Sequence, residues 1–230
     1  MRYPLIWSLV FALLGACNNR PNSNAASDAV SGKENTGAVP QTAVRKNIIF
    51  FGNSLTAAYQ LSPEQGFTAL LQHKIDSLQL PYRCVNAGLS GETTADGVNR
   101  VDWVLDQGAA VFVLELGGND ALRGLPVTNS KQNLQTIIDK VKAKYPDCKI
   151  IVAGMLAPPN LGTAYTHAFR DMYPALAKTN KAALIPFLLE GVAADPALNL
   201  EDGIHPNPAG HKIVAETIWK VLRKELGVEG

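Results

Sequence analysis

The chain alternates short, nearly continuous apolar runs with longer segments in which apolar residues recur every three or four positions. The short runs are typical of strands buried on both faces, and the longer spacing is typical of amphipathic helices. The apolar runs predict strands at residues 47–51, 82–88, 109–120, 149–156 and 182–187. The helical pattern predicts helices at residues 66–80, 93–108, 134–146, 165–180 and 208–227.

This regular alternation predicts an α/β fold made of one sheet covered by helices. Five strand-helix units joined by right-handed crossovers give a three-layer α/β/α sandwich with a five-stranded parallel sheet, flavodoxin-like in topology. Two details are specific enough to check. Thr128 or Ser130 is expected to cap the helix through residues 134–146, and Pro174 is expected to kink or divide the helix at residues 165–180.

Residues 1–16 predict a secretion signal of the lipoprotein type. Arg2 precedes an apolar run from Leu5 to Leu14, shorter than the roughly 20 residues that a membrane-spanning helix needs. The "LGAC" ending at Cys17 resembles a bacterial lipobox, although an ordinary signal peptide with a chance cysteine is the alternative. We expect an exported protein whose lipidated Cys17 anchors it to a membrane, facing the periplasm or the cell exterior.

Residues 17–44 predict a disordered tether, since they are rich in Asn, Ser, Ala and Gly and have no apolar period. Such a segment cannot bury enough surface to offset the entropy lost on ordering. The folded domain is therefore expected at residues 45–228, and its 47% hydrophobic composition suits a single domain with a core of its own.

Charge and cysteine content narrow the classes of partner. The 21 Lys and Arg residues nearly balance the 20 Asp and Glu residues. The sequence therefore lacks the excess of basic residues that is typical of nucleic-acid-binding proteins. Cys84 and Cys148 lie in or beside strand-like runs, which favours buried free thiols, although export permits a disulfide. His205 and His211 are six residues apart without a metal-binding helical motif. We expect a monomer that needs no metal or cofactor.

Polar and glycine-rich segments follow the predicted strands. In chain order they are "GNSLT" (52–56), "NAGLSGETT" (86–94), "GGND" (117–120), "APPNLG" (157–162) and "DGIHPN" (202–207). In doubly wound sheets the carboxyl ends of the strands meet at one edge, where ligands bind. A serine, an asparagine, free glycine amides and an Asp-x-x-His pair at that edge are the groups that acyl transfer needs.

Four of these segments, in this order, resemble the signature blocks of the GDSL, or SGNH, hydrolase superfamily: "GNSLT", "SGETT", "GGND" and "DGIHP". "VLELGGNDALRG" and "DGIHPN" are most similar to bacterial secreted thioesterase, lysophospholipase and arylesterase enzymes, and the resemblance extends from about Lys46 to Leu226. It implies a serine esterase that acts on aryl esters, short or medium acyl esters, acyl thioesters or lysophospholipids.

The resemblance also implies roles for individual residues. Ser54 matches the nucleophile, His205 the base and Asp202 the residue that orients the base. The amides of Ser54 and Gly91 and the side chain of Asn119 match the oxyanion hole. Chemistry agrees with this assignment, because Asp202 precedes His205 by three residues, so one turn can hold its carboxylate on the imidazole Nδ1.

Other readings of these residues stay open. Ser54 would be a helix N-cap in the commonest use of a serine at such a position. Ser90 is a rival nucleophile, but "GLSGE" lacks the Gly-x-Ser-x-Gly pattern of the nucleophile elbow. Asp120 would either contact substrate or brace its loop. His211 is expected to be solvated or to cap the last helix.

The remaining expectations concern three loop leucines, the Asn at position 53, and two alternative functions. Leu122, Leu125 and Leu161 would line an acyl pocket or simply cover the sheet. Asn53 stands where the family block usually has Asp, which puts the electrostatic field on Ser54 in doubt. The alternative enzyme is a carbohydrate O-deacetylase. An alternative of another class is a non-catalytic surface lipoprotein that binds a ligand at the same edge.

Overall fold

A computed structural model describes residues 44–228; the predicted signal segment, Cys17 and nearly all of the predicted tether lie outside the described residues. The strands are β1 (Lys46–Gly52), β2 (Tyr82–Gly88), β3 (Val111–Glu115), β4 (Lys149–Ala153) and β5 (Ala183–Ile185). The α-helices are α1 (Ser54–Ala57), α2 (Phe67–Ser77), α3 (Thr94–Leu105), α4 (Gly118–Leu122), α5 (Val127–Lys144), α6 (Thr163–Asn180) and α7 (Pro208–Glu225). Short 3₁₀ turns occupy Pro63–Gln65 and Pro159–Leu161.

The five strands form one parallel sheet in the order β2-β1-β3-β4-β5. This order is that of the flavodoxin-like doubly wound folds, and it confirms the predicted architecture. The chain reverses its direction of winding between β1 and β3, the two central neighbours. Connections after these strands therefore leave toward opposite faces, and a crevice is expected at their carboxyl ends.

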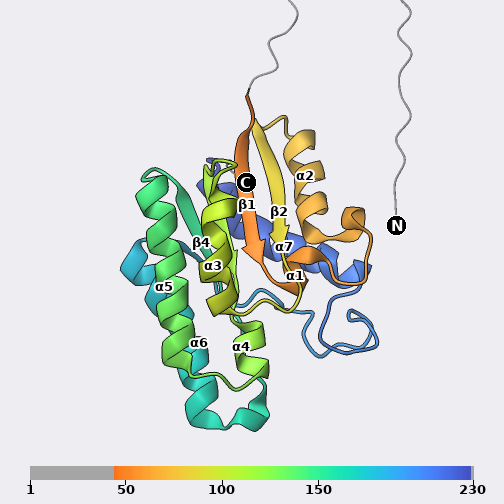
Figure 1. Ribbon diagram of the computed structural model, residues 1–230. Coiled ribbons are helices and arrows are strands. Elements are labelled where there is room, and N and C mark those ends of the chain that lie inside the picture. Colours follow the sequence, from red (N-terminus) through yellow and green to blue (C-terminus); the bar gives the residue numbers. More distant parts are fainter. Residues whose placement is uncertain (1–43, 229–230) are drawn as a thin grey trace, which may run out of the picture. The chain divides into compact units, whose positions relative to one another are not determined.

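Helices cover both faces of the sheet. α2 and α7 pack together on one face, and α3, α5 and α6 pack side by side on the other. In Figure 1, α3 and α5 lie in front of the sheet and α7 passes behind it. The core is built where the strands meet these helices, and its largest fully buried side chains include Phe50, Phe51, Phe67, Phe112, Phe169 and Tyr173.

The structure contradicts the predicted cap of α5 and the predicted division of α6. α5 begins at Val127 after Pro126, so neither Thr128 nor Ser130 caps it; Ser130 is buried and its hydroxyl donates to a carboxylate instead. Pro174 neither ends nor divides α6, which runs unbroken from Thr163 to Asn180. Pro174 lies on the exposed side of α6, where water can satisfy the carbonyl that a proline leaves unpaired.

The prediction of free cysteines is confirmed: Cys84 and Cys148 are both free and partly buried. Cys84 lies on β2 and Cys148 precedes β4, so β1 and β3 separate them by three strand spacings, about 14 Å. A disulfide needs Cα atoms within about 7 Å. Burial, with the Asp76 charge added at Cys84, raises the pKa of both thiols to about 12.

No helix between residues 44 and 228 has both the length and the apolar character needed to cross a membrane.

Candidate active site

The candidate site lies at the carboxyl edge of the sheet, around the crevice between β1 and β3. The arrowheads of β1 and β2 in Figure 1 point to this edge, where α1 and α4 also lie. α1 directly follows β1, and α4 directly follows β3. Two very short helices thus begin where the strands end, and their first residues face the crevice.

The segment of residues 52–57, here called the Ser54 turn, joins β1 to α1. Asn53 is the N-cap of α1, because its Oδ1 accepts from the backbone N–H of Leu55 at 2.9 Å. Ser54 is therefore the first helical residue and not the cap. Its hydroxyl is left for another partner, and its N–H donates to none of the described residues.

Ser54, His205 and Asp202 form a continuous hydrogen-bonded row. Ser54 Oγ lies 2.8 Å from His205 Nε2, and His205 Nδ1 lies 2.7 Å from Asp202 Oδ2. With the ring proton on Nδ1, donated to the carboxylate, Nε2 accepts from the serine hydroxyl. A side chain 151 residues away in sequence is thus brought onto Ser54 by the loop that precedes α7.

Asp202 is held by its own loop as well as by the imidazole. Its Oδ1 accepts from the N–H groups of Ile204 and His205, both at 3.0 Å. Burial works in the opposite direction, but the hydrogen bonds from Ile204 and His205 hold the pKa of Asp202 below its ordinary value. The carboxylate therefore stays charged and oriented near neutral pH, although 34% of its side chain is exposed.

Tyr59 covers one face of His205. The two ring centroids are 4.6 Å apart at an interplanar angle of 39°. Tyr59 follows α1 within a turn where Ala58 and Gln60 both have positive φ, so the chain doubles back and presents the ring to the imidazole. Sequence reasoning missed this residue, since a tyrosine five positions after a serine carries no motif.

The residues expected to form an oxyanion hole are divided between two cavities. Ser54 and Asn119 both line one cavity, here called the Ser54 cavity, whereas Gly91 lines a neighbouring cavity of about 500 Å³. Asn119 Nδ2 donates to the Glu92 carbonyl at 2.9 Å, which fixes the side chain and leaves its second N–H free. The Gly91 N–H donates to none of the described residues, and Gly91 has a φ of +82°, which favours glycine.

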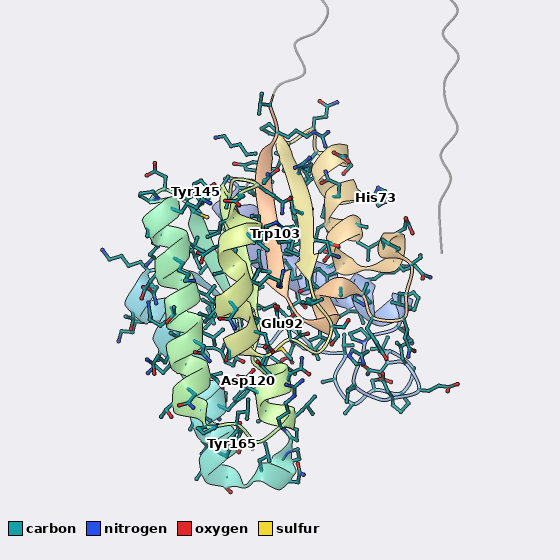
Figure 2. The ribbon with its side chains drawn as sticks, viewed as in Figure 1. His73, Glu92, Trp103, Asp120, Tyr145 and Tyr165 are labelled. Carbon is teal, nitrogen blue, oxygen red and sulfur yellow. The ribbon has the colours of Figure 1, made fainter. Side chains whose placement is uncertain are left out.

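The loop that carries Gly91 is fixed by an ion pair that sequence reasoning also missed. Arg100 Nε and Nη2 donate to the two carboxylate oxygens of Glu92 at 2.6 and 2.5 Å, and Nη2 also donates to the Ala87 carbonyl. Glu92 is only 3% exposed, and Figure 2 shows it at the site end of α3. Two parallel hydrogen bonds of this kind orient both partners. Arg123 adds a hydrogen bond to the Gly91 carbonyl at 2.9 Å.

Asp120 braces the site and does not line the Ser54 cavity, so the structure does not place it in contact with substrate. Its carboxylate accepts from the Thr94 N–H at 2.9 Å, the Thr94 hydroxyl at 2.6 Å and the Ser130 hydroxyl at 3.0 Å. The side chain is 2% exposed. Asp120 therefore ties α4 to the start of α3 and to α5, and so holds the helix that carries Asn119.

The Ser54 cavity has a volume of about 400 Å³ and a mostly apolar lining. Of the three leucines considered above, Leu122 lines it, while Leu125 and Leu161 do not. Leu125 instead offers its carbonyl to Tyr165 Oη at 2.7 Å. The other apolar side chains of the lining are Leu55, Met155, Leu156, Ala157, Pro158, Phe187, Leu189, Ala193, Ala194 and Ile204.

His211 is buried, which corrects the expectation of a solvated residue. Its Nδ1 accepts from the N–H of Phe67, the first residue of α2, at 3.2 Å. It therefore satisfies the start of another helix instead of its own. Burial first, and then the nearby His205, lower the pKa of His211 to about 4, so it is neutral at physiological pH. His73 and His167 are exposed.

Between residues 44 and 228, no group of three or more His, Cys, Asp and Glu side chains is arranged to hold a metal ion.

Comparison with known proteins gives consistent matches. The sequence pattern of the GDSL-like Lipase/Acylhydrolase family matches residues 50–213. Esterase TesA of Pseudomonas aeruginosa is 39% identical over 184 residues, which cover 80% of this chain and 90% of that protein. Thioesterase 1/protease 1/lysophospholipase L1 of Escherichia coli K12 is 35% identical over 184 residues, covering 80% of this chain and 86% of that protein.

A solved structure agrees over the same region. The psychrotrophic esterase EstA from Pseudoalteromonas sp., in a structure inhibited by monoethylphosphonate, matches with a TM-score of 0.75 and 31% identity. The match covers 79% of this chain and 99% of that one.

Proposed function

Because the chain belongs to the GDSL-like lipase/acylhydrolase family and is a carboxylic ester hydrolase, we propose that Ser54 is its nucleophile, with His205 as the base and Asp202 as its orienter. The observation that carries the proposal is the hydrogen-bonded row from Ser54 Oγ through both imidazole nitrogens to Asp202. Such a row supplies what a serine hydroxyl lacks, a neutral base in contact with its proton.

In this mechanism Ser54 Oγ attacks the carbonyl carbon of the ester while its proton passes to His205 Nε2. The imidazolium, stabilised by Asp202, then protonates the leaving alcohol or thiol, and an acyl-enzyme remains on Ser54. Water then attacks the acyl carbonyl carbon while His205 takes its proton. The bond to Ser54 Oγ breaks, His205 returns the proton to Ser54 Oγ, and the acid is released. The free N–H groups of Ser54, Asn119 and Gly91 are the donors we assign to the oxyanion.

The lining of the Ser54 cavity supports an acyl chain as the group bound there. His205 is the one side chain of that lining with an ionisable group, and most of the other lining residues are apolar. Such a surface favours a hydrocarbon chain over a sugar, because apolar burial stabilises the chain while sugar hydroxyls need partners. We therefore propose aryl esters, acyl esters or thioesters and lysophospholipids as substrates. No feature of this cavity favours the carbohydrate O-deacetylase.

A fluorophosphonate probe tests the assignment of the nucleophile. Ser54→Ala should abolish labelling and hydrolysis of an activated aryl ester, whereas Ser90→Ala, a matched control in the neighbouring loop, should still be labelled. Labelled and active Ser54→Ala would refute the mechanism, and an unlabelled wild type would favour the non-catalytic ligand-binding lipoprotein. A panel of acyl chain lengths and acetylated sugars then distinguishes the acyl esterase from the deacetylase.

We also propose that the protein is exported and anchored by a lipid on Cys17. The support is the signal-like segment ending in "LGAC" and the polar composition of residues 17–44, long enough for a reach of roughly 30 Å. Cys17→Ser should move the protein from the membrane fraction to the soluble fraction with esterase activity intact. Retention of the Cys17→Ser protein in membranes would contradict the anchor without touching the proposed catalysis.

A further inference from the structure

A buried acid lies directly beneath the Ser54 turn. Glu115 is the last residue of β3, is 2% exposed, and pairs in register with Gly52 of β1. One of its carboxylate oxygens, Oε2, accepts from the Asn53 N–H at 3.1 Å and from the Thr56 hydroxyl at 2.8 Å. These two donors flank Ser54, one on each side. A single oxygen therefore holds both ends of the segment that presents the nucleophile.

The chain is built to admit this contact. A Cβ added at Gly52 would overlap the Thr56 hydroxyl and the Glu115 carboxylate, so glycine is required where β1 meets the acid. The other carboxylate oxygen of Glu115, Oε1, is buried and has no hydrogen-bond partner among the described residues. A purely structural brace would be expected to satisfy both oxygens, because a buried polar atom without a partner is costly.

No cation of the described part of the chain forms an ion pair with this acid. Burial raises the pKa of Glu115 to about 7, and the hydrogen bonds from Thr56 and Asn53 oppose that rise without cancelling it. From α6, Tyr173 Oη donates to the carbonyl next to Glu115, at Leu116. Burial, then Glu115 and then Asp120 of α4, raise the pKa of Tyr173. The residues of the Ser54 turn that donate hydrogen bonds to Glu115 are Asn53 and Thr56, and both are neutral.

We propose that Glu115 is a positioning residue for Ser54, and that loss of its proton strengthens its hold on the Ser54 turn and increases esterase activity. The inference rests on the proposed function, since it assumes that Ser54 is the nucleophile. Hydrogen bonds to a charged acceptor are stronger than those to a neutral one. An ionised Glu115 therefore fixes Asn53 and Thr56 more tightly, and with them the Ser54 N–H and hydroxyl.

The negative charge of Glu115 is kept apart from the reaction itself. Glu115 does not line the Ser54 cavity, so the Ser54 turn separates its carboxylate from the oxygen that becomes negative during attack. Positioning dominates in this arrangement, since a misplacement of about 1 Å at a reacting group can cost 10²-fold in rate. Glu115 thus acts through the turn and has no contact with substrate.

The test compares the pH dependence of kcat/KM in wild type and Glu115→Gln on one activated aryl ester. Glutamine keeps the shape and the acceptor oxygen of Glu115 but cannot ionise. Any pH dependence from the catalytic row is common to both proteins and cancels in their ratio. The ratio of wild type to variant should be near one at about pH 5.5 and should rise to roughly three- to tenfold at about pH 8.5. A ratio that is constant, or that falls with pH, would overturn the proposal.

Variants at Thr56 and at Glu216 sharpen the comparison. Thr56→Val removes the donor that most lowers the pKa of Glu115, so the rise in activity with pH should move to higher pH, while Thr56→Ser should leave it in place. Glu216→Gln, the same substitution at an exposed glutamate of α7, should give a flat ratio to wild type. If Thr56→Val leaves the profile unmoved, Glu115 does not control the turn. If the kcat/KM ratio of wild type to Glu115→Gln does not change with pH while the Ser54→Ala variant is inactive, only this inference is refuted. If the Ser54→Ala variant is active, the proposed function is refuted.

Discussion

The Asn119 side chain has two N–H groups, and each has a different role. One donates to the Glu92 carbonyl and fixes the side chain, so the other is already aimed before substrate arrives. A preorganised donor of this kind acts mainly in the transition state. Asn119→Ala should therefore lower kcat by roughly 10²–10³-fold with little change in KM. Steady-state kinetics on an activated ester measures this, with the exposed Asn129→Ala as control; a change confined to KM would make Asn119 a substrate-binding residue.

Tyr59 provides a second prediction at the scale of single residues. Its ring lies against His205, and the face of an aromatic ring attracts a cation, so in the proposed mechanism the ring favours the imidazolium that would form as Ser54 attacks. Tyr59→Leu should lower kcat by roughly three- to tenfold, since such contacts are worth about 0.5–1 kcal/mol at exposed sites and more when desolvated. Tyr59→Phe keeps the ring and should stay close to wild type in kcat. Equal losses in both variants would assign the effect to the hydroxyl instead.

Individual residues differ in how readily the sequence reveals them. Ser54, Asn119, Asp202 and His205 follow predicted strands or stand in a recognisable spacing, so their convergence could be expected. Glu115 could not be singled out, because it stands inside an apolar run and only the folded sheet shows that it meets Asn53 and Thr56. The sequence also could not show which of the loop leucines face the Ser54 cavity. Leu122 lines the cavity, but Leu125 and Leu161 do not.

Among the secondary-structure elements, the long ones could be predicted and the short ones could not. α2, α3, α5, α6 and α7 contain 11 to 18 residues each, enough for the helical spacing of apolar residues to repeat. α1 and α4 contain four and five residues, little more than one turn, so no period is visible in the sequence. Yet α1 presents Ser54 and α4 presents Asn119, which means that the elements carrying the site are those that periodicity cannot find.

A helix of five residues cannot hold its position through its own hydrogen bonds, and α4 depends on Asp120 to fix it. Asp120→Ala would leave the Thr94 N–H and two hydroxyls without their buried acceptor, at about 1–3 kcal/mol for each group left unpaired. The variant should therefore lower the melting temperature and also kcat, because Asn119 moves with α4. Thermal unfolding and kinetics measure both. A raised KM with unchanged stability would instead support the contact with substrate that the cavity geometry does not show.

For the whole molecule, the alternation of strands and helices was enough to predict the layers and the parallel sheet. Right-handed crossovers leave few arrangements for five strand-helix units, and the observed order β2-β1-β3-β4-β5 is one of these few. The electrostatic balance of the folded state could not be predicted in the same way. It depends on which buried ionisable groups have their pKa shifted on folding, and Glu115 and His211 are two such groups.

These two groups act on stability in opposite ranges of pH. Because the pKa of Glu115 rises from 4.5 to about 7 on folding, its favourable contribution is complete below pH 4.5 and is lost as the pH rises through about 7. Because the pKa of His211 falls from 6.5 to about 4, its contribution is complete above pH 6.5 and is lost as the pH falls through about 4. The wild type should therefore be most stable at mildly acidic pH.

Glu115→Gln isolates the first of these effects, since His211 is present in both proteins and its contribution cancels. A rise in pKa from 4.5 to about 7 corresponds to about 3 kcal/mol, at 1.36 kcal/mol for each pH unit. Between pH 5 and pH 8.5, the free energy of unfolding of Glu115→Gln should therefore increase relative to wild type by up to that amount. Denaturant titrations at the two pH values, with Glu216→Gln as control, measure the difference. If the two proteins keep a constant difference in unfolding free energy, Glu115 does not lose a proton in the folded protein over this range, and the rise in activity proposed for its ionisation would have no source.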